Sequence, residues 1–270
     1  MIDDRVSSKE LEFIRRRLSD RDLAILRAVA AHQFMTTRQI MRLHFHAHQS
    51  EPSGVRATNR VLNRLLDLRV LGRLERAVGG VRAGSSCYVW CLDVVGDRMN
   101  RVENGSPRRR FFEPSLTFLG HKLAVAETRI VIEETARERE LELLALDIEW
   151  SAWRPYLGSA GESIHLKPDL GTIVASADHE DHWFIEVDQG TESFRTLLDK
   201  CAAYETYRRT GREQAIRGVF PRVLWIMPST SRAEQLRDHI ASTKALDPRL
   251  FAVVTPDALS KTISEAGTVA

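Results

Sequence analysis

The stretch FIEVDQGTE, residues 184–192, specifies the fold of the second half of the chain. It begins as an apolar strand, carries Glu186 and Asp188 at alternate positions, and ends in a glycine turn. Because side chains alternate across a strand, both carboxylates lie on one face, about 7 Å apart along it. A Lys-Pro-Asp turn ending at Asp169 precedes another apolar run. Three acidic groups beside one sheet predict a site for a hard divalent cation.

The segments on either side of this strand indicate a mixed α/β domain. A helix, three strands and then helix–strand pairs are typical of an α/β core with a mixed sheet. The apolar periodicity predicts helices at 116–140, 191–209 and 231–242, and strands at 143–150, 170–175, 182–188, 219–227 and 250–255.

The first half reads as three helices followed by a hairpin. Ser19 is the predicted N-cap of the first helix, with Asp22 three residues later as in a capping box. The other predicted elements are helices at 38–45 and 55–71, and strands at 74–76 and 87–92 around a glycine-containing loop at 79–84. This order of elements is that of a winged helix-turn-helix.

The third of these helices carries a face of Arg and Asn side chains spaced at i, i+3, i+4 and i+7. In a winged helix-turn-helix this helix enters the major groove and the hairpin lies against the DNA backbone. Arg and Asn can pair with guanine and adenine edges. The predicted contacts to double-stranded DNA come from Arg56, Asn59, Arg60, Asn63 and Arg64 on the helix and from Arg73, Arg76 and Arg82 near the wing. A solvated face or a protein-binding winged helix is the alternative.

The charge of the chain is divided unevenly. Residues 1–113 contain 21 Lys and Arg against 13 Asp and Glu, a net charge of +8, and the remainder contains 18 against 24, a net charge of −6. A basic half suits phosphate binding. The sign changes at a basic stretch with two prolines, so we predict a linker at 101–115 between domains at 18–100 and 116–256.

The cysteine count and the hydropathy pattern bear on the compartment. The chain has an odd number of cysteines, three, and starts with a polar segment. A secretory signal and an apolar run of bilayer length are both missing from the sequence. These features predict a cytoplasmic protein that does not enter a membrane.

The second half resembles the PD-(D/E)XK nuclease superfamily over about residues 116–227. Its Pro-Asp pair ending at Asp169 matches the first motif, and the strand with Glu186 matches the second. In that superfamily a lysine normally follows the glutamate by two residues, and here that position is Asp188. The resemblance implies a PD-(D/E)XK-like mixed-sheet α/β domain in the second half. With the order of elements in the first half, it predicts an α/β (α+β) protein in which a winged helix-turn-helix precedes that domain.

The same resemblance implies a set of catalytic residues. Some members carry the lysine on the next helix, where this chain has Lys200, and Lys167 beside the first acid is the alternative donor. Glu127 on the preceding long helix matches a further metal-binding acid of some members. The predicted metal ligands for Mg²⁺ or Mn²⁺ are Asp169 and Glu186, which match the superfamily motifs, and Asp188, which strand alternation places on the same face as Glu186.

The whole chain looks like the replication-relaxation family over about residues 18–245. The resemblance rests on LSDRD (18–22), FLGH (118–121), KPD (167–169), the stretch 184–192, and Lys200 and Tyr204. It implies a role in the replication, DNA relaxation or transfer of plasmids and integrative elements. The implied partners are double-stranded DNA and other replication or transfer proteins, and a homodimer is left open.

Two functions follow from these patterns. The first is a DNA-processing protein whose acidic cluster cleaves phosphodiester bonds with a metal ion. The second is a non-enzymatic regulator or relaxosome accessory with a degenerate nuclease fold. In that case Glu186 and Asp188 would pair with Arg195 or Lys200. Asp188 at the lysine position favours the second function, whereas Asp169, Glu186 and Lys200 together favour the first.

Overall fold

The computed structural model describes residues 6–46, 50–74, 88–105, 113–158, 160–177 and 179–265. The chain packs as two compact units, Met1–Ile130 and Val131–Ala270. The protein is a mixed α/β protein with helices and a five-stranded mixed sheet. In the described part of the chain, none of the helices has the length and apolar composition needed to cross a membrane.

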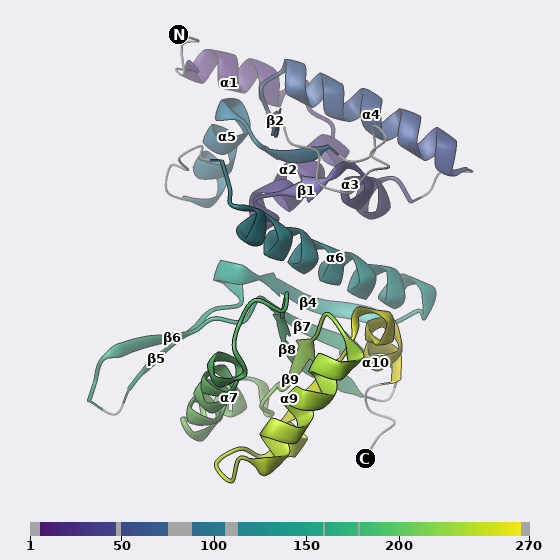
Figure 1. Ribbon diagram of the computed structural model, residues 1–270. Helices are drawn as coiled ribbons and strands as arrows, with labels where there is room; N and C mark the ends of the chain where they lie inside the picture. Colours follow the sequence, from purple (N-terminus) through teal and green to yellow (C-terminus); the bar gives the residue numbers. More distant parts are fainter. Residues whose placement is uncertain are drawn as a thin grey trace. The chain divides into compact units, whose positions relative to one another are not determined.

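The first unit is built of helices around a small antiparallel sheet with strand order β1-β3-β2 (Figure 1). Its helices are α1 (Ser8–Arg15), α2 (Asp20–His32), α3 (Thr37–His44), α4 (Glu51–Asp67), α5 (Val94–Asn104) and the first part of α6 (Leu116–Glu138). Its strands are β1 (Met35–Thr36), β2 (Leu71–Arg73) and β3 (Val89–Leu92).

Local hydrogen bonds fix where the helices of this unit begin. The Ser19 hydroxyl accepts from the Asp22 N–H, and the Asp22 carboxylate accepts from the Ser19 N–H at 2.8 Å. This capping box, predicted from the sequence, satisfies two backbone donors at the start of α2. Thr36 and Gln39 form a second capping box at the start of α3. The two capping boxes fix the residues at which α2 and α3 begin.

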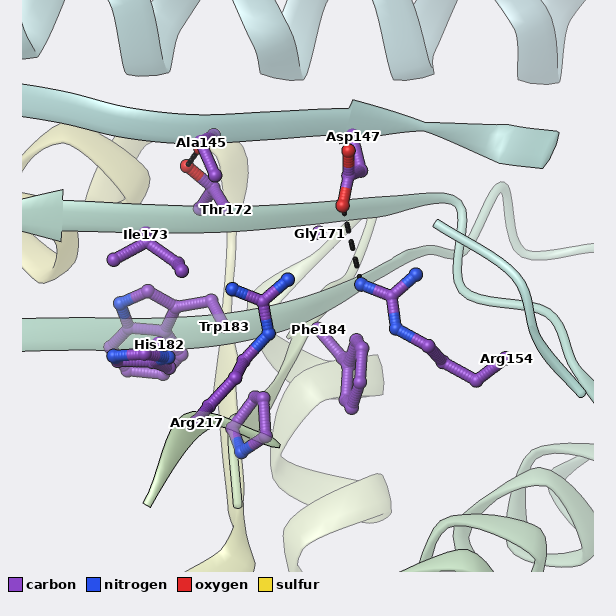
Figure 2. Close-up of a pocket in the computed structure, with 11 residues that line it drawn as sticks. Ala145, Asp147, Arg154, Gly171, Thr172, Ile173, His182, Trp183, Phe184 and Arg217 are labelled. Atoms are coloured by element: carbon purple, nitrogen blue, oxygen red, sulfur yellow. Dashed lines mark hydrogen bonds and ion pairs between the residues drawn. The ribbon is translucent and has the colours of Figure 1, made fainter. Parts of the chain in front are cut away.

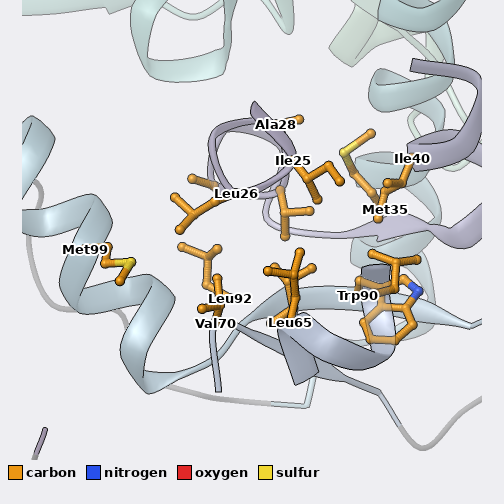
Figure 3. Packing of buried hydrophobic residues seen from close by; sticks show 14 of the residues in the cluster. Ile25, Leu26, Ala28, Met35, Ile40, Leu65, Val70, Trp90, Leu92 and Met99 are labelled. Atoms are coloured by element: carbon orange, nitrogen blue, oxygen red, sulfur yellow. The ribbon is translucent and has the colours of Figure 1, made fainter. Parts of the chain in front are cut away.

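The core of the first unit lies where α2, α4 and the sheet meet. Figure 3 shows Leu26 of α2, Leu65 of α4 and Leu92 of β3 in this cluster, and all three are buried. Burying such a side chain contributes roughly 1.5–3 kcal/mol. Ala126 and Ile130 of α6 belong to the same cluster. The first part of α6 therefore packs with the first unit.

The second unit contains a five-stranded mixed sheet with strand order β10-β9-β8-β7-β4 (Figure 1). β10, β9 and β8 run parallel to one another. β7 runs antiparallel to β8, and β4 runs antiparallel to β7. A separate hairpin, β5–β6, extends away from this sheet. The strands are β4 (Glu142–Ile148), β5 (Arg154–Leu157), β6 (Ser163–Leu166), β7 (Leu170–Ala175), β8 (Glu180–Val187), β9 (Arg222–Ile226) and β10 (Phe251–Val254).

One face of this sheet is covered by α7 (Phe194–Arg209), which packs beside α9 (Thr230–Ser242). Phe184 of β8 contacts the Tyr204 ring of α7, with centroids 5.8 Å apart. Because side chains alternate along β8, Glu186 lies on the same face as Phe184. The strand therefore carries Glu186 directly beneath α7. The short helices α8 (Arg212–Arg217) and α10 (Leu259–Glu265) complete the described unit, together with three 3₁₀ turns.

Several elements differ from the sequence prediction. α7 begins at Phe194 because Ser193, not Thr191, accepts the capping hydrogen bond from Thr196. α4 begins at Glu51, where a proline in the first turn is compatible with a helix start. The helices α1, α5, α8 and α10 and the β5–β6 hairpin were not predicted.

The division between the units also bears on the predicted domain boundary. The units divide inside α6, between Ile130 and Val131, because apolar residues on the first part of this helix join the first core. Helix α5 extends to Asn104 and so enters the predicted linker at 101–115. Residues 106–112 of that linker lie outside the described residues. Accessibility of the linker to cleavage stays a prediction.

Candidate functional site

The candidate site lies at one end of β7 and β8, where Asp169 and Glu186 come together. The Asp169 carboxylate accepts a hydrogen bond of 2.8 Å from the Val187 N–H, and its own N–H donates to the Ile185 carbonyl. These bonds fix Asp169 against the end of β8. Glu186 is buried beneath α7, where its Oε1 accepts a 2.6 Å hydrogen bond from the Tyr204 hydroxyl.

Burial raises the pKa of Glu186 to about 8, and the neighbouring Asp169 carboxylate contributes to this rise. The Lys200 ammonium and the Tyr204 hydrogen bond act in the opposite direction, since both favour the charged form. The net result is a buried carboxyl group that is difficult to ionise. A cation beside Asp169 and Glu186 would relieve this cost.

Lys200 of α7 supplies a positive charge at this place. Its Nζ lies 3.6 Å from Glu186 Oε2 and 2.9 Å from Glu192 Oε2. Burial alone would lower the pKa of Lys200, but Glu186 and Glu192 outweigh it, so the pKa is raised and the side chain stays protonated. The structure thus brings the helix lysine to the buried acid, the geometry that the relocated-lysine hypothesis requires. Its catalytic role stays a prediction.

Asp188 makes a different set of contacts. Both of its carboxylate oxygens bind the Arg232 guanidinium of α9, which also donates to the Glu192 carbonyl. The Asp188 side chain is almost fully buried in this ion pair. Within the described ranges, no three His, Cys, Asp or Glu side chains are arranged to hold a metal ion. The three-carboxylate ligand set stays a prediction, and the contacts of Asp188 assign it to fixing α9.

Glu127 lies on the part of α6 that belongs to the first unit. It forms an ion pair with Arg42, and Gln39 Nε2 donates to it at 3.2 Å. These partners belong to the first unit as well. The place predicted for Glu127 beside the acids of the second unit therefore stays a prediction.

The predicted DNA-contacting face lies on α4. Arg56, Arg60 and Asn63 are exposed, and Asn59 is half-buried. Arg64 is also exposed, but its Nη2 lies 2.6 Å from Oδ1 of the buried Asp22. Arg64 therefore stabilises the packing of α4 against α2, in addition to any contact it makes with DNA.

The residues predicted near the wing are only partly described. Arg73 is exposed at the end of β2, with its guanidinium 4.1 Å from the centroid of the Tyr88 ring. Arg76 and Arg82 lie outside the described residues, as does the glycine-containing loop.

Sequence reasoning missed three partners of the charged residues at the site. Tyr204, Glu192 and Arg232 contact Glu186, Lys200 and Asp188 respectively. For Tyr204 the signal was helical spacing, because a residue four positions after Lys200 lies on the same face of α7. Arg232 carried no such signal, since it comes from a helix that is distant in the sequence. It takes the place beside Asp188 that the scaffold hypothesis gave to Arg195 or Lys200.

A charged pocket lies elsewhere in the second unit, between β4, β7, β8 and α8. Figure 2 shows Arg154 reaching Asp147, and the two atoms Nη2 and Oδ2 are 3.2 Å apart. Arg154 Nε also lies 2.8 Å from Oε1 of the buried Glu213. Through these two ion pairs Arg154 links the start of the β5–β6 hairpin to the sheet and to α8.

Known proteins resemble this chain to different degrees. No curated protein matches it. The chain is similar to the solved structure of restriction endonuclease FokI bound to DNA, at 13% identity and a TM-score of 0.25. That match covers 98% of this chain and 46% of the endonuclease chain, and it is too distant to support any residue assignment. A model of the replication-relaxation family matches residues 26–223, which is most of the chain. The chain therefore belongs to the replication-relaxation family.

Proposed function

We propose that this protein acts on DNA during the replication, relaxation or transfer of a plasmid or integrative element. In this proposal its second unit cleaves a phosphodiester bond with a divalent cation. The observation that carries the proposal is the meeting of Asp169, Glu186 and Lys200 at one end of the sheet. Two carboxylates beside an ammonium group provide ligands for Mg²⁺ and a positive charge for the phosphate.

The two units divide the work in this proposal. We infer that the first unit is a winged helix-turn-helix, because α2, α3 and α4 precede the antiparallel pair β2–β3 and α4 presents exposed Arg and Asn side chains. We infer that the second unit is a PD-(D/E)XK-like domain with its lysine on the following helix. The mixed sheet, the Pro-Asp turn and the contact of Lys200 with Glu186 support this inference.

The residues present fit a divalent cation held by two carboxylates. Mg²⁺ is commonly bound by one or two carboxylates together with waters and substrate phosphates. Asp169 and Glu186 supply this set, and the raised pKa of Glu186 reflects in part a repulsion that a cation would remove. When bound, the cation supplies a more acidic water and polarises the phosphate.

The side chains around the pair have separate tasks. The Val187 N–H orients Asp169, and the Tyr204 hydroxyl holds Oε1 of Glu186. Lys200 places its ammonium beside Oε2, where it would offset the negative charge that develops on the phosphate. Glu192 keeps this lysine protonated and oriented. Arg232 and Asp188 fix the end of β8 against α9.

The test is nicking of supercoiled plasmid with Mg²⁺ or Mn²⁺. We expect nicking by the wild type and its loss in Asp169→Asn, Glu186→Gln and Lys200→Ala. The exposed substitutions Glu234→Gln and Lys244→Ala serve as matched controls and should leave nicking unchanged. Mn²⁺ should also raise the melting temperature of the wild type but not that of Asp169→Asn.

A second function is favoured by the ion pairs that occupy the charged side chains. Asp188 is bound by Arg232 and Lys200 by Glu192, an arrangement that also suits a non-enzymatic scaffold. A wild type that binds duplex DNA but neither nicks plasmid nor responds to Mn²⁺ would establish the scaffold and overturn the nuclease.

A further inference from the structure

Two tryptophans are stacked in the turn that follows β4. The Trp150 and Trp153 ring centroids are 5.3 Å apart, with only 11° between the ring planes. The Lys167 ammonium lies 4.6 Å from the centroid of the Trp153 ring. Trp150 is 61% exposed, although one of its faces lies against Trp153. A large aromatic surface therefore remains in contact with water.

This stack is next to the candidate nuclease site through the backbone. The Glu149 N–H donates a 2.9 Å hydrogen bond to the Asp169 carbonyl, and Trp150 is the next residue. Lys167 precedes Asp169 by two residues. The aromatic surface and the first acid of the site are therefore held at the same end of the sheet, within the second unit.

The turn that presents Trp150 is held firmly. Glu149 has a φ of 48°, a left-handed conformation that is uncommon for a residue with a side chain. The Ser151 hydroxyl accepts from the Ile148 N–H at 2.8 Å, and Arg154 donates to the Ser151 carbonyl at 2.9 Å. Arg154 is itself fixed by the ion pair drawn in Figure 2. A strained but well-braced turn with an exposed aromatic ring is typical of a binding site.

We propose that Trp150, Trp153 and Lys167 form a stacking platform for an unpaired base of a single DNA strand that leads to the Asp169–Glu186 site. This inference rests on the proposed function and deepens it, because it names the substrate as DNA with locally separated strands. Aromatic rings stack on any base, and a nearby ammonium attracts the phosphates of the same strand. Bases inside a duplex are covered by their neighbours and cannot stack on such a surface.

The experiment measures binding of a short, dye-labelled oligothymidine in EDTA by the fluorescence anisotropy of the dye. Trp150→Ala should weaken this binding roughly 5- to 150-fold, the effect of losing one stacked base. Trp150→Phe should restore much of the affinity. Ile216→Ala, which removes another exposed apolar side chain of the second unit, should have no effect. Thermal unfolding of each variant checks that the fold is retained.

Two further probes distinguish base stacking from attraction of the phosphates and from duplex binding. An abasic oligonucleotide carries the same phosphates without bases, so wild type and Trp150→Ala should bind it equally weakly. A blunt duplex should be bound equally by both proteins. Equal affinity of wild type and Trp150→Ala for oligothymidine would overturn the proposal. A Trp150→Ala variant that changes the oligomeric state instead would identify a contact between copies of this chain and would also overturn it.

The outcome is independent of catalysis because EDTA prevents metal-dependent cleavage. Loss of oligothymidine binding in Trp150→Ala supports the platform even if the wild type fails to nick plasmid. In that event the proposed nuclease fails and the second unit remains a single-strand binding module. Nicking without any effect of Trp150→Ala on oligothymidine affinity would preserve the nuclease and remove the platform.

Discussion

Each unit buries an ionisable group whose pKa is shifted, and the two shifts stabilise the neutral form of a base in one unit and of an acid in the other. The first unit buries His32, whose pKa is lowered to about 3 by burial and then by Arg129 and Lys122. The second unit buries Glu186, whose pKa is raised to about 8 by burial and then by Asp169. Both groups are neutral inside the folded protein over much of the intervening pH range. The units should therefore respond to pH in opposite directions.

The charges that surround the two groups also differ. His32 lies among cations at 3.4 Å from Arg129, so its neutral form is the one that the surrounding charges favour. Glu186 has a cation beside it and a second acid as well, so its surrounding charges act in both directions. A bound ligand can shift the protonation of a group in such surroundings. We therefore expect added divalent cations to change the stability of the second unit and not that of the first.

The largest expected effect is the change in the stability of the second unit with pH that Glu186 causes. Between about pH 4.5 and 8 the folded unit keeps a proton on Glu186 that the unfolded chain releases, so stability falls as the pH rises. In EDTA the second unit should lose on the order of 4 kcal/mol across this window. Glu186→Gln should abolish this slope and be more stable than the wild type at pH 8. The free energy of unfolding of the second unit is measured by urea unfolding followed by hydrogen exchange in peptides of β8 and α7.

The exposed substitution Glu234→Gln is the control for this measurement and should keep the slope of the wild type. Adding Mn²⁺ at pH 8 should recover stability in the wild type but not in Glu186→Gln. A wild type with the same stability at pH 5 and pH 8 in EDTA would show that burial of Glu186 imposes no such cost.

The next effect is the change in the stability of the first unit with pH that His32 causes, and it has the opposite sign. In the unfolded chain His32 takes up a proton below about pH 6.5, whereas in the folded unit it stays neutral down to about pH 3. The folded unit therefore becomes less stable as the pH falls between these values. From about pH 6.5 to 4.5 the first unit should lose roughly 3 kcal/mol, while the second unit gains. Hydrogen exchange in peptides of α2 against those of β8 reports the two units in one experiment.

His32→Gln should reduce the acid response of the first unit to the part due to His44, whose pKa burial lowers to about 4. His165→Gln, at an exposed position, should leave the response unchanged. Parallel loss of stability in both units on acidification would contradict their opposite response to pH. The result would then indicate that the two units unfold together or that His32 gains a proton while folded.

The sequence predicted the long helices and most strands of the second unit's sheet, but it missed several short elements and the contacts between distant ones. The order of strands and helices around residues 184–192 and the capping box at Ser19 and Asp22 depend on local spacing, and the structure has them. The partner of Asp188 depends on how α9 lies against β8, and no local pattern reveals that Arg232 will reach it. Likewise, no local pattern tells that Ala126 and Ile130 of α6 pack into the core of the first unit. Buried charges are therefore the least predictable part of the site.

The smallest expected effect concerns the surface of the first unit, where two exposed arginines on α4 have different partners. Arg60 is exposed and is proposed to contact DNA, whereas Arg64 is bound to the buried Asp22. Arg60→Ala should weaken binding to a duplex selected from a random pool by about 1–3 kcal/mol and leave the melting temperature unchanged. Arg64→Ala should instead lower the melting temperature, because it leaves a buried carboxylate without its guanidinium. Fluorescence anisotropy and thermal unfolding separate the two outcomes, with the exposed Arg137→Ala in the second unit as control. If Arg60→Ala bound DNA as tightly as this control, α4 would not be the DNA-contacting helix.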